Sequence, residues 1–232
     1  MKRYIPWLIG FLLLAAFLIA LPFSITIVPI EQVEAMQQSE EFDAVAYVDG
    51  IWQSQILPTV LENAVDLQTI LSAIQVDDKG IAQKGQLTEV ATEYGSITVG
   101  EAHVYLVKGR GTVTAVDTES RAGSMTLALD DYSGPVAVKL YLGPRIPSDV
   151  TAVRDAVGFI QFGDFREQTE YGKVAKEINT RVAAEVLEPL DKQNLVGKQL
   201  EFYGATSIRT FNLVNVDLSE IVAVPVQISV ME

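Results

Sequence analysis

The sequence predicts an α+β protein with a membrane anchor, and three features lead to this fold class. An uncharged apolar stretch begins at Ile5, short β-type segments follow Glu101, and apolar residues return to helical spacing between residues 151 and 189. Strands, then helices, then further strands is the order of a small Greek-key barrel of the OB type. We therefore expect an N-terminal transmembrane helix followed by a small antiparallel OB-like β-barrel with flanking helices.

The anchor prediction rests on residues 5–28, which are uncharged and follow the basic pair Lys2-Arg3. A helix of about 20 apolar residues crosses the hydrocarbon core of a bilayer. Acidic residues follow the segment, so the N-terminus is expected in the cytoplasm and the main domain in the periplasm, with a single pass through the inner membrane. A cleaved signal peptide is the alternative, but its apolar core is usually about 7–15 residues long. The length of the run favours the uncleaved anchor.

Charge and cysteine content exclude several classes of protein. The chain has 17 basic and 30 acidic residues, which gives a formal net charge of −13. Nucleic-acid binding and docking on anionic lipid both depend on basic patches, so we expect no nucleic-acid partner. The sequence contains no cysteine, so it offers none for disulfides, for thiolate metal sites or for lipid modification.

These patterns divide the chain into four segments. They are the membrane anchor (residues 1–30), a stalk (31–45), a helical N-terminal part (46–100) and the OB-like barrel (101–232) with inserted helices at 151–189. Apolar residues from Leu57 to Ile74 recur at helical spacing, with Pro58 in the first turn, where its missing N–H is tolerated. The pair Asp77-Asp78 at the end of this helix is interpreted as a solvated turn rather than a metal site.

The barrel prediction starts from four runs rich in β-branched and aromatic residues, namely His103–Lys108, Thr112–Thr118, Ser124–Asp130 and Val136–Leu142. The short turns between them favour antiparallel pairing, because parallel strands need longer crossovers. Gly109-Arg110-Gly111 has an alternative interpretation as a bulge that bends one long strand. Two more strands, Lys198–Tyr203 and Ile221–Val230, complete the chain.

Two helices are expected between these groups of strands, at Thr151–Gly158 and Arg166–Leu187. Asp164 and Glu167 have the spacing of a capping box for the longer helix. Its predicted inward stripe consists of Tyr171, Val174, Ile178, Val182 and Val186. Four charged residues of alternating sign are spaced four apart and are interpreted as a solvated face: Lys173, Glu177, Arg181 and Glu185.

Several short motifs resemble a known family. They are KGRGTVTAVDTESRAG (residues 108–123), Gly143-Pro144, Arg154-Asp155, FIQFGDF (159–165), and the early Trp52, Pro58, Asp66 and Leu67. In this order they resemble the bacterial predicted periplasmic lipoproteins of domain-of-unknown-function family 2291, over roughly Phe42 to Gly204. The resemblance implies an association with sugar ABC transporter components, beside whose genes members are often encoded, and it implies no known activity. The chain departs from the family by lacking the lipobox cysteine, and a transmembrane anchor would provide the same tether.

The candidate site residues are four charges that flank turns within these motifs: Asp117, Arg121, Arg154 and Asp155. One interpretation is a polar cluster that grips a ligand or partner, and the other is a set of ion pairs and turn hydrogen bonds that braces a helix against the sheet. We favour bracing, because Asp117 ends a strand and Asp155 lies inside a short helix.

No catalytic residue, metal ligand or cofactor is expected. His103 is the only histidine and is expected to be packed or at the surface, since zinc sites usually combine several His or Cys ligands. The sequence also lacks a G-x-S-x-G nucleophile motif and a phosphate-binding loop.

The sequence therefore favours a non-enzymatic, membrane-tethered accessory or binding protein near an ABC-type sugar uptake system. The alternative is an extracytoplasmic carbohydrate-active hydrolase, because a pair of catalytic carboxylates about 5–10 Å apart cannot be recognised from sequence. A pocket with facing carboxylates would favour the hydrolase, and an exposed groove would favour binding.

The apolar segment yields the first prediction. Because the run is long enough to remain in the membrane, we expect mass spectrometry of the mature protein to find the N-terminus intact. An N-terminus anywhere between Ala20 and Glu34 would contradict the anchor.

Overall fold

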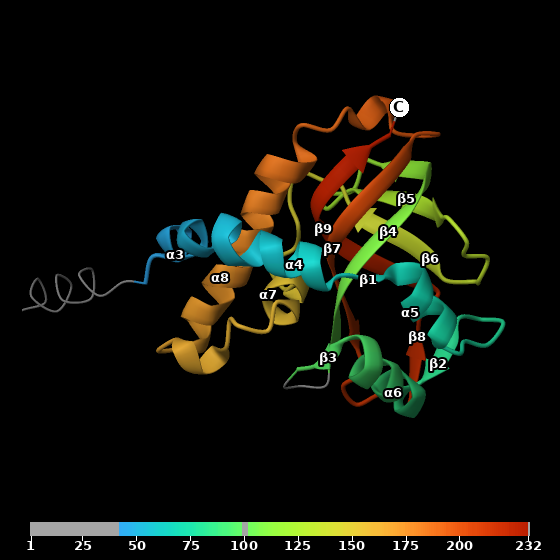
Figure 1. The fold of residues 1–232 in the computed structure, drawn as a ribbon, viewed down its shortest axis with the longest axis horizontal. Coiled ribbons are helices and arrows are strands. Elements are labelled where there is room, and N and C mark those ends of the chain that lie inside the picture. The colour runs from blue at the N-terminus through green and yellow to red at the C-terminus, as the bar shows by residue number, and fades with distance from the viewer. Residues whose placement is uncertain (1–41, 99–101, 232) are drawn as a thin grey trace, which may run out of the picture. The chain divides into compact units, whose positions relative to one another are not determined.

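The computed structural model describes residues 42–98 and 102–231. The predicted anchor at residues 5–28 and most of the predicted stalk lie outside the described residues. Within the described ranges, no helix combines the length and apolarity needed to cross a membrane. The residues from Asp43 onward cluster as one compact unit, in which helices pack on a strongly bent sheet (Figure 1).

Among the described residues the main sheet has seven strands, and the five longest of them, together with the helices, confirm the α+β class. These five strands are β4 (Ala102–Asp117), β5 (Ser124–Leu129), β6 (Ala137–Tyr141), β7 (Gln199–Arg209) and β9 (Glu220–Val230). The pairing order is β4-β5-β6-β9-β7, and β7 also pairs with β4. All these pairs are antiparallel except β6–β9, which is parallel. The expectation of a purely antiparallel sheet was wrong there, because the helices and β7 between these strands provide the long connection that parallel pairing needs.

The first two predicted strands are one long strand, β4, as the bulge alternative proposed. Its first half pairs with β7 and its second half with β5, and both partners overlap only at Gly111 and Thr112. The register shift lies between Val113 and Ala115, a few residues after the predicted position. Because β4 changes partner halfway along its length, the five strands pair in a circuit, from β4 through β5, β6, β9 and β7 back to β4, and β4 bends where its partner changes.

The core of the sheet follows the period of two that the sequence predicts. Along β5, Met125, Leu127 and Leu129 are buried, and the residues between them are more exposed. Leu140 on β6 and Phe202 on β7 are fully buried in the same cluster. Apolar side chains on the inner face of the sheet therefore form the main core.

The N-terminal part begins with α3 (Ala44–Ile51), a π-helical segment η1 (Trp52–Ile56) and α4 (Leu57–Asn63), which run on without interruption. The Asp43 carboxylate caps this run by accepting the Ala46 N–H at 3.0 Å. The predicted helix from Leu57 to Ile74 is wrong, because Val65–Asp66 form strand β1 and pair in parallel with β4. The helix α5 (Leu67–Ala73) starts after this strand.

A small second sheet and one more helix cover one end of the main sheet. The second sheet pairs β2 (Ile81–Gln83) with β8 (Asn215–Asp217), and α6 (Lys84–Tyr94) leads into β3 (Ser96–Ile97). The predicted solvated turn before β2 is confirmed, since the exposed Asp77 carboxylate accepts the Lys79 and Ile81 N–H groups at 2.8 and 2.9 Å. The Ile81 bond is the main reason that the pKa of Asp77 is lowered.

The inserted helices form the other flank of the molecule (Figure 1). They are α7 (Ala152–Ala156), η2 (Phe162–Asp164), α8 (Gln168–Arg181), the π-helical η3 (Val182–Leu187) and η4 (Lys192–Asn194). The predicted inward stripe holds at Val174, Ile178 and Val182, but the next buried residue is Leu187 instead of Val186. A π-helical turn contains more residues than an α-helical turn, so it moves the buried face along the chain.

The start of α8 also differs from the prediction. Asp164 accepts the Gln161 N–H at 3.1 Å within η2, so it does not cap α8. The Glu170 carboxylate, which is buried, instead accepts the Arg166 N–H at 3.0 Å and its guanidinium at 2.7 Å. The Arg166 guanidinium lowers the pKa of Glu170, which keeps the carboxylate ionised at the start of the helix.

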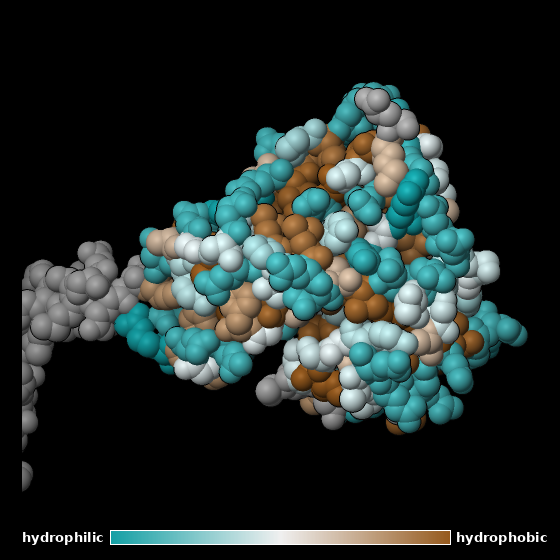
Figure 2. All heavy atoms as spheres, in the orientation of Figure 1, coloured by the Kyte–Doolittle hydropathy of each residue, from teal (hydrophilic) through white to brown (hydrophobic). Residues whose placement is uncertain are grey.

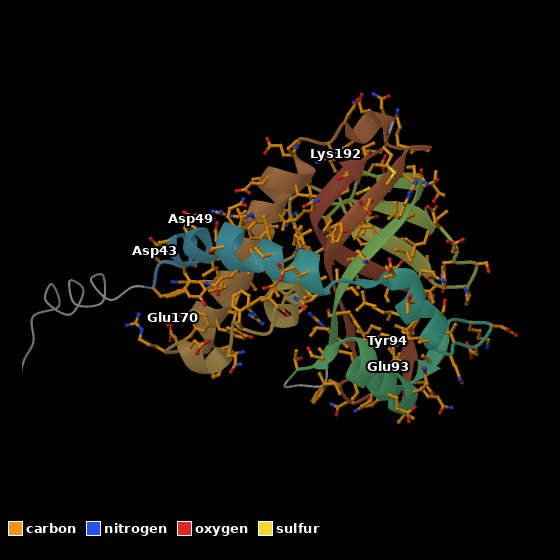
Figure 3. The ribbon with its side chains drawn as sticks, viewed as in Figure 1. Asp43, Asp49, Glu93, Tyr94, Glu170 and Lys192 are labelled. Carbon is orange, nitrogen blue, oxygen red and sulfur yellow. The ribbon has the colours of Figure 1, made fainter. Side chains whose placement is uncertain are left out.

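The interpretation of the charged row on α8 as a solvated face was wrong at Arg181. Its side chain is only 16% exposed, pairs with Asp49 of α3, and lies 3.7 Å from Glu185. The guanidinium carbon also lies 5.8 Å from the centroid of the Trp52 ring. Figure 3 shows Asp49 on α3, beside α8. Arg181 therefore fixes the N-terminal helices to the inserted helices.

The packing of Trp52 generates a prediction about stability. Trp52 is 1% exposed, so Trp52→Ala should lower the free energy of unfolding by about 3–5 kcal/mol, as expected for truncation of a buried aromatic residue. Phe211→Ala is the matched control, because Phe211 is 62% exposed and should change stability by about 0.5 kcal/mol or less. Chemical denaturation measures both, and equal midpoints for the two variants would contradict the packing.

Candidate functional site

The structure brings two of the four candidate charges, Arg154 and Asp155, into direct contact. Nε and Nη2 of Arg154 donate to Oδ1 of Asp155 at 2.8 and 2.7 Å. The other carboxylate oxygen accepts the Thr151 hydroxyl at 2.6 Å. The two side chains are 9% and 11% exposed. A nearly buried, fully hydrogen-bonded ion pair therefore lies at one end of α7.

Tyr171 of α8 completes this group. Its carbonyl oxygen accepts Nη1 of Arg154 at 3.0 Å, and its hydroxyl donates to Asp155 at 3.2 Å. The Arg154 guanidinium carbon lies 3.5 Å from the centroid of the Tyr171 ring, which is cation–π geometry. Burial raises the pKa of the Tyr171 phenol, so the hydroxyl keeps the proton that it donates. Arg154 and Asp155 thus connect α7 to α8.

Asp117 and Arg121 lie elsewhere, in the connection between β4 and β5. Asp117 accepts the N–H groups of Glu119 and Ser120 at 2.9 and 3.1 Å. The Ser120 hydroxyl and these N–H groups lower the pKa of Asp117. Arg121 is exposed. Within residues 42–98 and 102–231, no hydrogen bond or ion pair joins these two residues to Arg154 or Asp155, so the four charges do not form one cluster.

Two of the glycine motifs meet at the end of this same connection. The Gly143 N–H donates to the Ala122 carbonyl at 2.6 Å, and a Cβ on Gly143 would lie 2.0 Å from that oxygen. Gly123 has a φ of 57°, in the left-handed region that favours glycine. The glycines therefore allow two loops to touch through their backbones and fix where the chain leaves β6 toward Pro144.

The surroundings of His103 do not indicate a metal site or a catalytic histidine. His103 is 1% exposed on β4, and its Nε2 lies 3.4 Å from the Thr210 hydroxyl. Among the described residues, no group of three His, Cys, Asp or Glu side chains could hold a metal ion. His103 is therefore packed in the interior, which was one of the two positions expected for it, and does not lie at the surface.

A large open cleft lies between the loop after β6 and the inserted helices. Its volume is about 780 Å³, and it is lined by three segments: residues 144–148, residues 176–188 of α8 and η3, and Lys192 of η4. The charged residues in its lining are Arg145, Lys176, Lys192 and Glu188. The charged residues of the lining are therefore mainly cationic, in contrast to those of the chain as a whole, and we call this hollow the cationic cleft.

A buried amide fixes one wall of this cleft. Asn179 is 4% exposed, and its Nδ2 donates to the carbonyls of Pro147 and Val150 at 3.2 and 2.7 Å. Both hydrogens of the side-chain amide are thus used to hold the loop against α8. Ala183 and Ala184 of η3 contribute only methyl groups to the lining. The cleft is therefore bounded by small side chains at η3 and by a hydrogen-bonded loop at Asn179.

A second hollow contains carboxylates, as a hydrolase would require. Asp149, Asp217 and Glu220 line a cavity of about 400 Å³. Arg209 lies 3.7 Å from the Asp149 carboxylate, and Lys139 lies 2.6 Å from that of Glu220. Asp217 accepts the Ser219 N–H at 2.8 Å, which lowers its pKa. Two of the carboxylates are therefore in ion pairs, and the third is stabilised in its ionised form.

A third hollow is apolar and smaller. It lies where η1, η3 and β9 meet, has a volume of about 320 Å³, and includes Trp52, Val186, Pro189, Val226 and Ile228 in its lining. Figure 2 shows the apolar side chains that gather on this part of the surface. This hollow contains no clustered charges and offers no reactive group.

Sequence reasoning missed the cationic cleft because its walls come from segments that are far apart in the chain. One usable signal was Arg145, which directly follows the Gly143-Pro144 motif. Lys176 and Lys192 gave no signal, since isolated lysines on a helix and in a turn are typical of any soluble surface. Figure 3 shows that Lys192 lies near the end of the inserted helices opposite to Glu170.

Comparison with known proteins gives one family. The profile of a family described as predicted periplasmic lipoprotein (DUF2291) matches residues 13–229. The match is longer than the region over which the motifs suggested the resemblance. A search of curated proteins found no match.

Comparison with solved structures supports the fold. The crystal structure of an OB-fold protein from Thermotoga maritima is similar, with a TM-score of 0.60 and 16% sequence identity. The alignment covers 83% of this chain and 100% of the other. At this identity the similarity concerns the fold alone, and it agrees with the OB-type order of strands and helices.

The Arg154 contacts generate a prediction that separates bracing from ligand binding. Arg154→Ala leaves the Asp155 carboxylate buried without its main partner, so the free energy of unfolding should fall by about 3–5 kcal/mol. Arg121→Ala is the control, since Arg121 is exposed and should change stability by about 0.5 kcal/mol or less. Thermal and chemical denaturation measure both variants. An unchanged melt for Arg154→Ala would contradict the bracing interpretation.

Proposed function

Because the chain belongs to the predicted periplasmic lipoprotein family DUF2291, we propose that it is a membrane-tethered extracytoplasmic accessory protein that binds a ligand or a partner and catalyses no reaction. The family supports the extracytoplasmic place of the main domain. The tether in this proposal is the apolar segment at residues 5–28, which replaces the lipid-modified cysteine of a lipoprotein.

The observation that carries the proposal is the contrast between the charged motif and the cleft. The Arg154–Asp155 pair is hydrogen-bonded to Thr151 and Tyr171, so its polar atoms are engaged within the protein. The cationic cleft, by comparison, is open and is bounded by a loop that Asn179 fixes. A preformed open cleft beside a rigid helical wall is suited to binding.

The hydrolase alternative has weaker support. A glycosidase needs one carboxylic acid with a raised pKa, which protonates the leaving group. Among the described carboxylates with a resolved shift, the pKa of Glu177 is the one that is raised, by burial and by Asp43. Glu177 lies on α8 and does not line the cavity that contains Asp149, Asp217 and Glu220. In that cavity Asp149 and Glu220 are in ion pairs with Arg209 and Lys139, which gives the general-acid role less support.

The partner in this proposal is an ABC-type sugar uptake system. The reason is the gene neighbourhood that the family resemblance implies, together with a location on the periplasmic side of the same membrane. An accessory protein of this kind would hold a small ligand or a transporter component near the membrane surface.

Affinity purification tests the proposed association. We expect the full chain, tagged at its C-terminus and extracted from its own membranes in mild detergent, to retain components of an ABC-type uptake system that mass spectrometry identifies. The control is residues 1–41 fused to an unrelated exported domain, which retains the tether but lacks the folded unit that begins at Asp43.

Two results would contradict the proposal. One is equal recovery of transporter components with the control fusion. The other is release of reducing sugar from polysaccharides by the purified protein, lost in Glu220→Gln, which would favour the hydrolase.

A further inference from the structure

We propose that the cleft between residues 144–148 and the α8–η3 helix is a binding site for a small anionic molecule that carries a phosphate or carboxylate group. Arg145, Lys176 and Lys192 would bind the anion. This inference rests on the proposed binding function and names its ligand class.

The charge of the cleft lining is opposite in sign to the net charge of the chain. The whole chain has 17 basic and 30 acidic residues, but the cleft lining has three basic residues and one acidic residue, Glu188. Like charges gathered on one concave surface raise the local potential and attract an ion of the opposite sign. The cleft thus favours anions although the chain as a whole has a negative net charge.

Arg145, Lys176 and Lys192 form no ion pair within the described ranges, although the charge of Lys176 partly offsets the rise that burial causes in the pKa of the neighbouring Glu177. Lys139, Arg154 and Arg181 each form an ion pair with a nearby carboxylate. No ion pair in residues 42–98 and 102–231 involves Arg145, Lys176 or Lys192. No carboxylate therefore holds these side chains in an ion pair that a ligand would have to break.

The chemistry of the lining fits a phosphate or carboxylate. An arginine guanidinium donates two parallel hydrogen bonds to either group, and lysine ammonium groups add point charges. The Ser148 side chain also lines the cleft and offers a hydroxyl donor. The lining thus offers three kinds of hydrogen-bond donor to one ligand: a guanidinium, two ammonium groups and a hydroxyl.

The cleft is also preformed. Asn179 holds the carbonyls of Pro147 and Val150 against α8, and the Gly143 N–H bond to Ala122 fixes the start of the same loop. A site whose walls are already ordered loses less conformational entropy when a ligand binds. The π-helical turn of η3 forms the opposite wall, and such turns are frequent at functional sites.

Size and net charge select a small ligand. A cleft volume of about 780 Å³ lies in the usual range of about 300–1,000 Å³ for small-molecule sites. A polyanion or an anionic bilayer would contact more of the protein than the cleft, and the formal net charge of −13 would repel both. A single anionic metabolite meets the cations without this repulsion.

Calorimetry and thermal melts of the full chain in detergent test the proposal with four probes at constant ionic strength. They are glucose 6-phosphate, glucuronate, inorganic phosphate and neutral glucose. We expect at least one anion to bind and raise the melting temperature, and glucose to do neither. The phosphate and carboxylate arms identify which group the site prefers.

Matched variants locate the binding. We expect the affinity for the anion to fall by about tenfold in each of three variants, Arg145→Gln, Lys176→Gln and Lys192→Gln, because each variant loses one charge-assisted contact. Lys79→Gln removes an exposed cation in the distant turn before β2 and should leave binding unchanged. Ala184→Trp adds an indole at an exposed position of the lining and should abolish binding without a change in charge or in the unliganded melt.

Three outcomes would overturn the inference. They are the absence of binding by all three anions at millimolar concentration, equal binding of glucose, and equal weakening by Lys79→Gln and the cleft variants. None of these outcomes alters the expected recovery of transporter components, so a failed anion site and a failed accessory function remain distinguishable.

Discussion

The buried contact between Arg154, Asp155 and Tyr171 is the constraint on which the rest of the structure depends. Arg154 and Asp155 belong to α7, whose apolar residues Ala152 and Val153 are buried and which packs against β4 and β7. Tyr171 belongs to α8. The charged group therefore joins a helix that is seated on the sheet to a longer helix that forms one wall of the cleft. A buried ion pair is stable only when its remaining polar atoms are satisfied, and here Thr151 and Tyr171 satisfy them.

Much of the fold could be predicted because it depends on local periodicity. The alternation along β5 and the helical spacing of Val174, Ile178 and Val182 both match the buried residues. The failures occurred where distant contacts override the local pattern. Val65–Asp66 interrupts a helical pattern because the backbone pairs with β4, and the buried face after Val182 moves because the helix changes to π geometry.

The candidate site was harder to predict than the fold, for the same physical reason. Arg154 and Asp155 are adjacent in sequence, so their proximity was foreseeable, but their contact with Tyr171 was not. The cleft requires Arg145, Lys176 and Lys192 to meet from a loop, a helix and a turn. None of these charges indicates a binding site by itself, because the residues are far apart in the sequence. The fold brings them together around one cleft, whereas the net charge of the chain is negative.

The central claim is that the Arg154–Asp155 pair supports the structure and leaves ligand binding to the cleft. A double-mutant cycle with Arg154→Met and Asp155→Asn tests it most directly, because each single change leaves one buried charge without its partner and the double change removes both. We expect each single variant to lose free energy of unfolding, and the sum of the two losses to exceed the loss in the double variant by about 0.5–3 kcal/mol. The double variant should keep its affinity for the anion. Strictly additive, small losses of stability together with lost anion binding would contradict it.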